Sequence, residues 1–304
     1  MHVHHQSRFL DLQALSALTH LRFTTRRRID GQYSGRHRSR QLGGAGEFVD
    51  FREYTAGDDL RRLDWKVLAR TGKRYLRLFQ DETNLSCLIL VDASGSMRFG
   101  GTQTAIDGPG SKLEFAQYFS TALSHLIVHG QDQVGLAIVS DKLRKFIPPG
   151  SSSEHLARVH TAIEKLQTQP ETQLALAMRE LFQRLSRRGV LLIISDFLCD
   201  SLEETFAAIR LYRARFWETV VLHLVHPEEE RLPEGTALRF EGLENDGRVD
   251  CSPAEIVAEY EARFEAYCAA VRSLAIATGS EYRRVSTAVP YVQALRGFLV
   301  ERTG

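Results

Sequence analysis

From residue 85 onward, short apolar runs alternate with segments in which apolar residues recur at helical spacing. Four of these runs, 87–92, 133–139, 190–195 and 219–225, are almost continuously apolar, as strands covered by helices on both faces should be. Such an alternation is typical of βαβ units that build a parallel sheet. The chain is therefore predicted to have an α/β, Rossmann-type fold with a mostly parallel sheet flanked by helices.

Two more strands are expected beside these four. Residues 144–147 follow Ser140-Asp141 closely enough to form an antiparallel edge strand, and a last strand is expected near 281–285.

The helices between the strands have their own start signals. Ser111, Ser201 and Ser252 each have a glutamate three residues later, the pattern of a capping box. The helix after Ser252 is predicted to run for about 26 residues, to Gly279. All three serines are expected to cap their helices.

Residues 1–84 differ in character from the rest. Leu10, Leu15 and Leu18 have the spacing of an amphipathic helix, and residues 31–46 are rich in glycine, serine and arginine, as surface loops are. We therefore expect two parts: residues 1–84, an N-terminal helix with an accessory segment, and residues 85–304, the α/β domain.

The overall composition argues against several classes of protein. With 39 basic and 38 acidic residues, the chain has no net field that would attract nucleic acid or an anionic membrane. No apolar stretch approaches the roughly 20 residues that span a bilayer, and the N-terminus does not resemble a secretory signal. We expect a cytoplasmic protein without membrane insertion.

The residues after the first apolar run are suited to binding a metal ion. Asp92, Ser94 and Ser96 offer three oxygen side chains two residues apart in one short loop, and Mg²⁺ prefers oxygen ligands. Only one of the three is charged. An ion held in this way keeps a free position for a carboxylate from a partner. Mn²⁺ or Ca²⁺ could bind in place of Mg²⁺.

Two later residues are expected near the same loop. Asp196 ends the run 190–195 as Asp92 ends the first run, and ligands of open parallel sheets bind beyond the carboxyl ends of the strands. Thr172 precedes a predicted helix and offers a further hydroxyl. Asp196 is interpreted as a carboxylate that binds the metal through water or orients the hydroxyl ligands. The purely structural alternative is a strand-to-helix turn in which the side chains of Asp92, Ser94 and Ser96 bond only to their own backbone.

In this order on alternating strands and helices, Asp92, Ser94, Ser96, Thr172 and Asp196 resemble the metal-ion-dependent adhesion site (MIDAS) of von Willebrand factor type A domains. The resemblance covers residues 85–304. Relatives tend to have glycine before the threonine and aspartate after it, whereas this chain has Glu171 and Gln173. The longer acidic side chain of Glu171 would either crowd the ion or lie in its outer shell.

The segment before the domain resembles the bacterial family named domain of unknown function 58. The resemblance lies in Gly46-Glu47-Phe48, in residues 52–65, in Ala69-Arg70 and in Glu82-Thr83-Asn84. Members of that family are often encoded beside MoxR-type AAA+ ATPases and are thought to act as adaptors or co-chaperones for them. The resemblance therefore implies an AAA+ ATPase as partner.

Two interpretations of the block 52–65 stay open. It can be a structural ion-pair network around a buried tryptophan, or a docking surface for a partner. The candidate partner-binding residues are Arg52, Tyr54, Asp58, Arg61, Asp64 and Trp65.

Our leading hypothesis is a non-enzymatic module in which bound Mg²⁺ receives an acidic side chain from a protein partner. Enzyme motifs are weak: the sequence Gly108-Pro109-Gly110-Ser111-Lys112 is not a phosphate loop, Ser94 is not in a nucleophile elbow, and His155 and His160 are expected on the exposed side of their helix. One alternative is a metal-dependent hydrolase that uses the same ion. Another is a scaffold that binds nucleic acid through residues 1–40, which contain eight arginines.

Overall fold

The structure is a computed structural model that describes residues 7–25, 47–55, 63–80, 85–100, 110–185, 188–232, 238–244 and 247–303. The chain divides into two compact units. Residues 1–26 and 86–304 form one, here called the α/β unit, and residues 27–85 form the other, the accessory unit. The sequence predicts that all of residues 1–84 belong to one accessory part. The structure instead groups the first 26 residues with the α/β unit.

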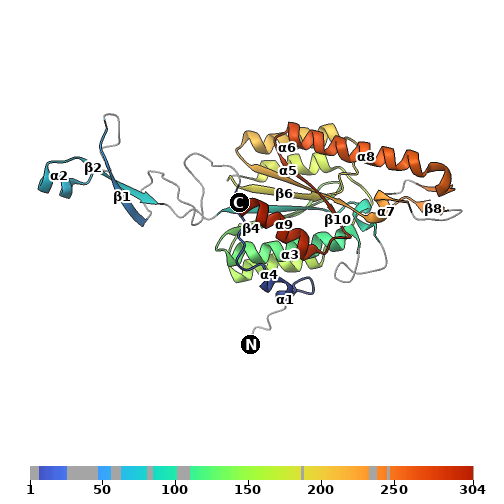
Figure 1. The fold of residues 1–304 in the computed structure, drawn as a ribbon, viewed down its shortest axis with the longest axis horizontal. Coiled ribbons are helices and arrows are strands. Elements are labelled where there is room, and N and C mark those ends of the chain that lie inside the picture. Colours follow the sequence, from blue (N-terminus) through green and yellow to red (C-terminus); the bar gives the residue numbers. More distant parts are fainter. Residues whose placement is uncertain are drawn as a thin grey trace. The chain divides into compact units, whose positions relative to one another are not determined.

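Six strands form the central sheet of the α/β unit: β3 (Ser86–Asp92), β4 (Gln133–Val139), β5 (Leu143–Gly150), β6 (Val190–Ser195), β7 (Glu218–Val225) and β10 (Glu281–Ser286). Their order is β10-β7-β6-β3-β4-β5, and all neighbours are parallel except β5, which is antiparallel to β4 (Figure 1). This confirms the predicted mostly parallel, Rossmann-like sheet with one antiparallel edge strand.

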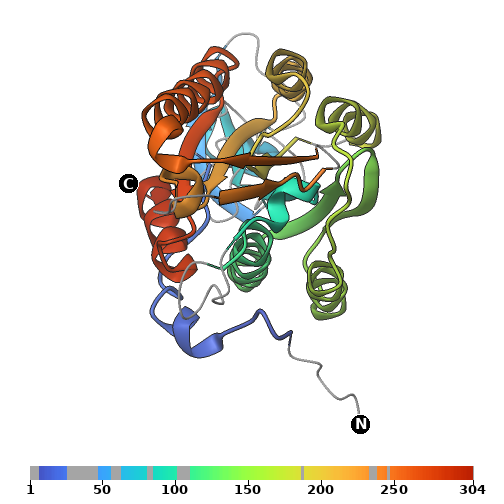
Figure 2. The ribbon, with the colours of Figure 1, turned by 90° about the vertical axis from the view of Figure 1, so that its right-hand side faces the viewer.

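Helices cover both faces of this sheet (Figures 1 and 2). One face is covered by α3 (Lys112–His129), α4 (Ser153–Glu164) and α9 (Tyr291–Thr303), and the other by α5 (Leu174–Arg184), α6 (Leu202–Ala214) and α8 (Pro253–Ala277). The central strands β3 and β6 are buried along their whole length as a result. Each leucine or isoleucine that they bury contributes about 1.5–3 kcal/mol.

The connections from β3 and β6 determine where a ligand can bind. After β3 the chain enters α3, on one face, and after β6 it enters α6, on the other. These two strands are neighbours in the sheet, with Val91 beside Ile194. The crevice that opens where neighbouring connections diverge is the usual ligand site of open α/β sheets.

The predicted helix starts are confirmed at two of three positions. The hydroxyls of Ser111 and Ser201 accept the backbone N–H of Glu114 and Glu204. Ser252 makes no such bond, so that expectation was wrong; Pro253 occupies the first turn, where its fixed φ favours the helix without a cap. The long helix α8 ends as expected before Gly279, whose φ of 68° lies in the left-handed region.

The N-terminal residues pack against α3 and α9. After the short helix α1 (Leu12–Ser16), the backbone carbonyl of Thr24 accepts a bond of 2.8 Å from Nε of buried Arg302, at the end of α9. The ring of Phe9 packs edge-on against Tyr118 of α3, with centroids 4.9 Å apart. These contacts explain why this segment belongs to the α/β unit.

The accessory unit contains an antiparallel pair and one helix. Strands β1 (Glu47–Glu53) and β2 (Tyr75–Gln80) pair with a shift in register between Phe48 and Asp50, and α2 (Trp65–Thr71) lies between them in sequence. A carboxylate oxygen of Asp64 accepts the N–H groups of Lys66 and Val67, so this aspartate caps α2.

A second antiparallel pair, β8 (Leu238–Glu241) and β9 (Arg248–Cys251), belongs to the α/β unit but forms its own two-stranded sheet. We call it the β8–β9 hairpin. It follows the short helix α7 (Pro227–Glu230) and precedes α8.

Two histidines on α4 lie differently from the prediction. His155 and His160 are buried, not exposed. The His155 ring nitrogen Nε2 lies 2.7 Å from the carbonyl oxygen of Val134, and Nε2 of His160 lies 3.1 Å from the Ser124 hydroxyl. Because these bonds satisfy the rings, α4 can turn both histidines inward.

Within the described residues, none of the helices combines the length and the apolar composition needed to cross a membrane.

Candidate functional site

The candidate site lies at the carboxyl ends of β3 and β6. Asp92 is the last residue of β3, and Asp196 directly follows β6. Both side chains are buried. The two loops therefore bring two carboxylates to the same edge of the sheet, as the sequence predicted for an open parallel sheet.

Asp92 is held by its own loop and by β6. One carboxylate oxygen accepts the N–H of Ser94 at 2.9 Å, and the other accepts the hydroxyl of Ser195 at 2.5 Å. Burial raises the pKa of Asp92 to about 7, and the charge of Asp196 adds to this shift, while the bonds from Ser195 and Ser94 oppose it. In the described part of the chain no basic side chain pairs with Asp92. Its buried charge therefore lacks a positive partner.

The two serine hydroxyls of the loop point toward each other. Oγ of Ser94 lies 3.1 Å from Oγ of Ser96, and both residues are buried. Ser94 precedes the 3₁₀ helix Gly95–Arg98, but its hydroxyl makes no capping bond there. Because the backbone does not use this hydroxyl, its lone pairs remain available to a cation.

Thr172 comes from a distant part of the chain and lies near the loop after β3. The backbone of Gln169 forms a bridge with Ser94, and its N–H donates to the carbonyl of Ala93 at 2.8 Å. This tie holds the loop before α5 against the loop after β3. Thr172 is buried, whereas the adjacent Glu171 is exposed, so the glutamate that departs from the family pattern does not fill the site.

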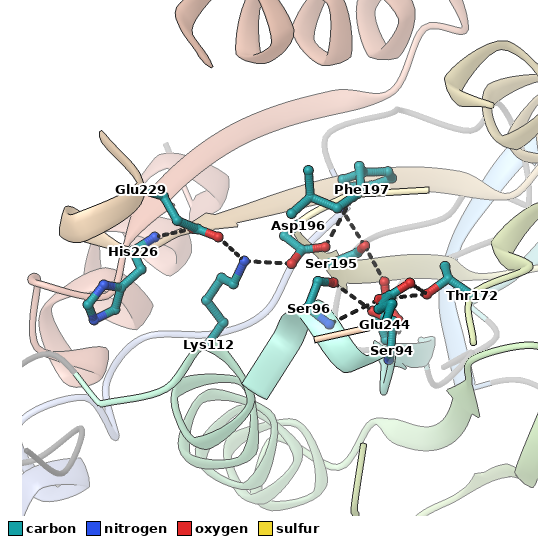
Figure 3. A network of polar contacts seen from close by, with 12 residues as sticks. Ser94, Ser96, Lys112, Thr172, Ser195, Asp196, Phe197, His226, Glu229 and Glu244 are labelled. Carbon is teal, nitrogen blue, oxygen red and sulfur yellow. Dashed lines mark hydrogen bonds and ion pairs between the residues drawn. The ribbon is translucent and has the colours of Figure 1, made fainter. Parts of the chain in front are cut away.

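A further acidic residue, Glu244 from the tip of the β8–β9 hairpin, lies among these groups (Figure 3). The hydroxyl of Thr172 lies 2.9 Å from each of its carboxylate oxygens, and one of these oxygens also accepts the N–H of Ser96 at 3.0 Å. A carboxylate is thus already held beside the hydroxyl groups.

Asp196 faces a different partner. Its Oδ2 lies 2.6 Å from Nζ of Lys112, which also pairs with Glu229, and its Oδ1 accepts the N–H of Leu198 at 3.1 Å (Figure 3). Burial disfavours the charge on Lys112, but the charges of Asp196 and Glu229 outweigh it and raise the pKa of the ammonium group. Asp196 is therefore bound to a fixed positive charge.

The five predicted ligands thus form two connected groups. Asp92, Ser94, Ser96 and Thr172 lie around the loop after β3, and Asp196 is joined to them through the adjacent Ser195, which bonds to Asp92. Over the described ranges, no set of three or more histidine, cysteine, aspartate or glutamate side chains is gathered as metal ligands. A cation here would rely on hydroxyl oxygens together with carboxylates.

A model of the family described as protein of unknown function DUF58 matches residues 50–270. The chain belongs to the DUF58 family. Uncharacterized proteins of Mycobacterium bovis and Mycobacterium tuberculosis are 29% identical over 230 residues, which cover 74% of this chain and 69% of theirs.

Two solved structures are similar to this DUF58 chain at lower identity. The conserved hypothetical protein BatB from Bacteroides thetaiotaomicron is 16% identical, with a TM-score of 0.44, and the match covers 72% of this chain and 99% of that one. An aerotolerance-related membrane protein from Bacteroides fragilis is 17% identical, with a TM-score of 0.46 and coverage of 72% and 98%.

The candidate partner-binding residues lie in the accessory unit of this DUF58 protein. Trp65 is 61% exposed, so the structural interpretation that expected a buried tryptophan was wrong. Asp64 is buried as the cap of α2, Tyr54 follows β1, and Arg52 belongs to β1. Asp58 and Arg61 lie outside the described residues.

Four residues around the candidate site were not predicted from the sequence: Lys112, Ser195, Glu229 and Glu244. Ser195 has only a weak signal in the sequence: it ends the apolar run 190–195 and is followed by Asp196. Glu229 and Glu244 lie in the stretch 228–246, which contains seven acidic residues, and nothing in the sequence distinguishes these two from solvated neighbours.

Proposed function

We propose that the α/β unit is a von Willebrand factor A-like domain that acts as a divalent-cation-dependent, non-enzymatic protein-binding module. The observation that supports this most directly is the buried Asp92, which has no basic partner among the described residues and lies next to the paired hydroxyls of Ser94 and Ser96. A bound cation would compensate that charge, because burying an unpaired carboxylate is costly.

The donor set fits a hard cation such as Mg²⁺. Asp92, Ser94, Ser96 and Thr172 would hold it through oxygen, and Mn²⁺ or Ca²⁺ accepts the same ligand type. A cation in this place supplies a Lewis-acidic position for a carboxylate. Asp196, which is bound to Lys112, would act on the ion from further away.

The partner would contribute an acidic side chain. The contacts of Glu244 support this, since Ser96 and Thr172 already present hydrogen-bond donors to a carboxylate. The partner that we propose is a MoxR-type AAA+ ATPase, for which this protein would be an adaptor or co-chaperone. The family resemblance supports that choice.

Metal and partner would bind cooperatively, because each completes the other's surroundings. The test is capture of proteins from lysate by the full chain over a titration of Mg²⁺, with identification by mass spectrometry. We expect an AAA+ ATPase to be captured only when Mg²⁺ is present, and capture to be lost with Asp92→Ala. Equal capture in chelator would refute the proposal.

A further inference from the structure

The β8–β9 hairpin is attached to the candidate site by its tip. Glu244 lies 148 residues from Ser96 and 72 residues from Thr172 in sequence, yet its carboxylate accepts bonds from both. These bonds are 2.9 and 3.0 Å long, and hydrogen bonds to a charged group are the stronger kind. One carboxylate thus links the loop after β3, the loop before α5 and the hairpin (Figure 3).

The tip also approaches the loop more closely than any side chain would allow. A Cβ at Gly95 would lie 2.5 Å from the carbonyl oxygen of Leu243 and 2.8 Å from Cγ of Glu244. Gly95 stands between the two serines of the candidate site. Glycine at this position therefore leaves the space into which the hairpin tip fits.

The rest of the hairpin is exposed. Along its strands, residues 239–241 and 248–250 are exposed, and the ion pairs Arg239–Asp250 and Arg248–Glu241 lie on its surface. Only its tip residues Leu243 and Glu244 are half-buried among those described between 239 and 250. Because an isolated two-stranded hairpin is marginal in water, its position depends on the tip contacts.

An open groove borders the tip. It has a volume of about 460 Å³, and its lining residues include Leu243, Glu244, Ser96, Leu198 and Tyr267. A side chain from outside can therefore reach the position next to Ser96 without passing through the core.

We propose that Glu244 is an internal ligand of this site: the β8–β9 hairpin supplies within the chain the carboxylate that a partner otherwise supplies. This inference rests on the proposed function. The Thr172 hydroxyl has one proton and two lone pairs, so it donates to Glu244 and still offers an oxygen to a cation. A partner's acidic residue must displace Glu244, and the tethered carboxylate competes at a high effective concentration.

The test compares Glu244→Ala with Glu241→Ala in the full chain. Both changes remove a glutamate from the same hairpin, but Glu241 pairs only with exposed Arg248 among the interactions given above. The first readout is hydrogen exchange in peptides that cover Leu238–Cys251. The second is binding of a polyglutamate peptide in the presence of Mn²⁺, and the third is the affinity for Mn²⁺ alone.

We expect Glu244→Ala to speed exchange in the hairpin about tenfold or more, the loss typical of hydrogen bonds to a charged group. It should also strengthen polyglutamate binding about tenfold or more, because the internal competitor is gone. Glu241→Ala should match the native chain in both readouts. Equal hairpin exchange in the two variants would overturn the inference, as would polyglutamate binding that Glu244→Ala leaves unchanged while Mn²⁺ binds.

The Mn²⁺ readout separates this inference from the proposed function. If Mn²⁺ binds neither the native chain nor any variant, the metal-dependent function fails. Faster hairpin exchange in Glu244→Ala would then still support Glu244 as the group that occupies the position beside Ser96 and Thr172.

Discussion

The ammonium group of Lys112 lies 2.6 Å from Oδ2 of Asp196, and both side chains are buried. Lys112 is the first residue of α3, and Asp196 follows β6, so the pair joins one face of the sheet to the edge where the candidate site lies. Glu229 is the second acid on the same ammonium. The pair fixes the orientation of Asp196 and keeps one positive charge next to the site.

Replacing Lys112 by methionine should destabilise the protein strongly. The change keeps the length of the side chain but leaves the buried carboxylate of Asp196 and the half-buried carboxylate of Glu229 without their positive partner. Removing one member of a buried ion pair costs about 3–5 kcal/mol. Urea denaturation followed by circular dichroism measures the loss, and Lys145→Met, at an exposed lysine on β5, is the control. A loss below about 1 kcal/mol would contradict this role, since that is the usual value of an exposed pair.

Replacing Asp92 by asparagine should have opposite effects in the absence and presence of metal. Burial raises the pKa of Asp92 to about 7, so above that pH the native chain carries a buried charge that asparagine lacks. Without metal, the variant should therefore be more stable than the native chain by about 1–3 kcal/mol above pH 7. An asparagine still offers an oxygen to the N–H of Ser94 and an amide to the hydroxyl of Ser195.

With Mg²⁺, the native chain should gain thermal stability and Asp92→Asn should not, because a ligand stabilises only the state that binds it. Thermal denaturation of both proteins at pH 8, with chelator and with Mg²⁺, measures the two effects. A native Tm that does not respond to Mg²⁺ would argue against the metal site.

The central sheet was predictable because local signals determine it. The apolar runs 133–139 and 190–195 have the same bounds as β4 and β6. A strand buried on both faces needs an almost unbroken apolar run, and such a run can be recognised in the sequence without knowledge of distant contacts. The positions of Asp92 and Asp196 follow from the strands, because the carboxyl ends of parallel strands share one edge.

The polar connections were not predictable in the same way. Glu244 is one of several acids in a mostly exposed hairpin. It is distinguished only by contacts between distant segments, which are the bonds from Ser96 and Thr172 and the close approach of the tip to Gly95. Lys112 is paired with acids 84 and 117 residues away, a distance over which single-sequence patterns carry no signal. The burial of His160 was not predicted, because its bond to Ser124 joins two different helices and has no signal in the local sequence.

Replacing Gly95 by alanine should displace the hairpin tip without unfolding the α/β unit. The added Cβ would meet the backbone oxygen of Leu243 at 2.5 Å, and a backbone atom in that position must move. Cleavage after Glu244 by a glutamyl endopeptidase should become several-fold faster, because the glutamate leaves its bonds to Ser96 and Thr172. Gly297→Ala is the matched control, since its Cβ meets no atom within 4 Å. Unchanged cleavage after Glu244 would show that the tip does not depend on the glycine.

The unfolding free energy should fall as the pH is lowered from about 6.5 to 4, in part through His160. Burial lowers the pKa of His160 to about 4, and the charge of His125 adds to this shift, while a bond involving the backbone of Thr121 opposes it. In the unfolded chain a histidine has a pKa of about 6.5, so between these values the unfolded state binds more protons and stability rises with pH. The contribution is complete above pH 6.5 and is lost as the pH falls toward 4.

His160→Gln should therefore reduce the acid-induced loss of unfolding free energy by about 1–2 kcal/mol, as measured by urea denaturation across this range. The control is His20→Gln, at an exposed histidine. Parallel curves for native protein and His160→Gln would refute the prediction.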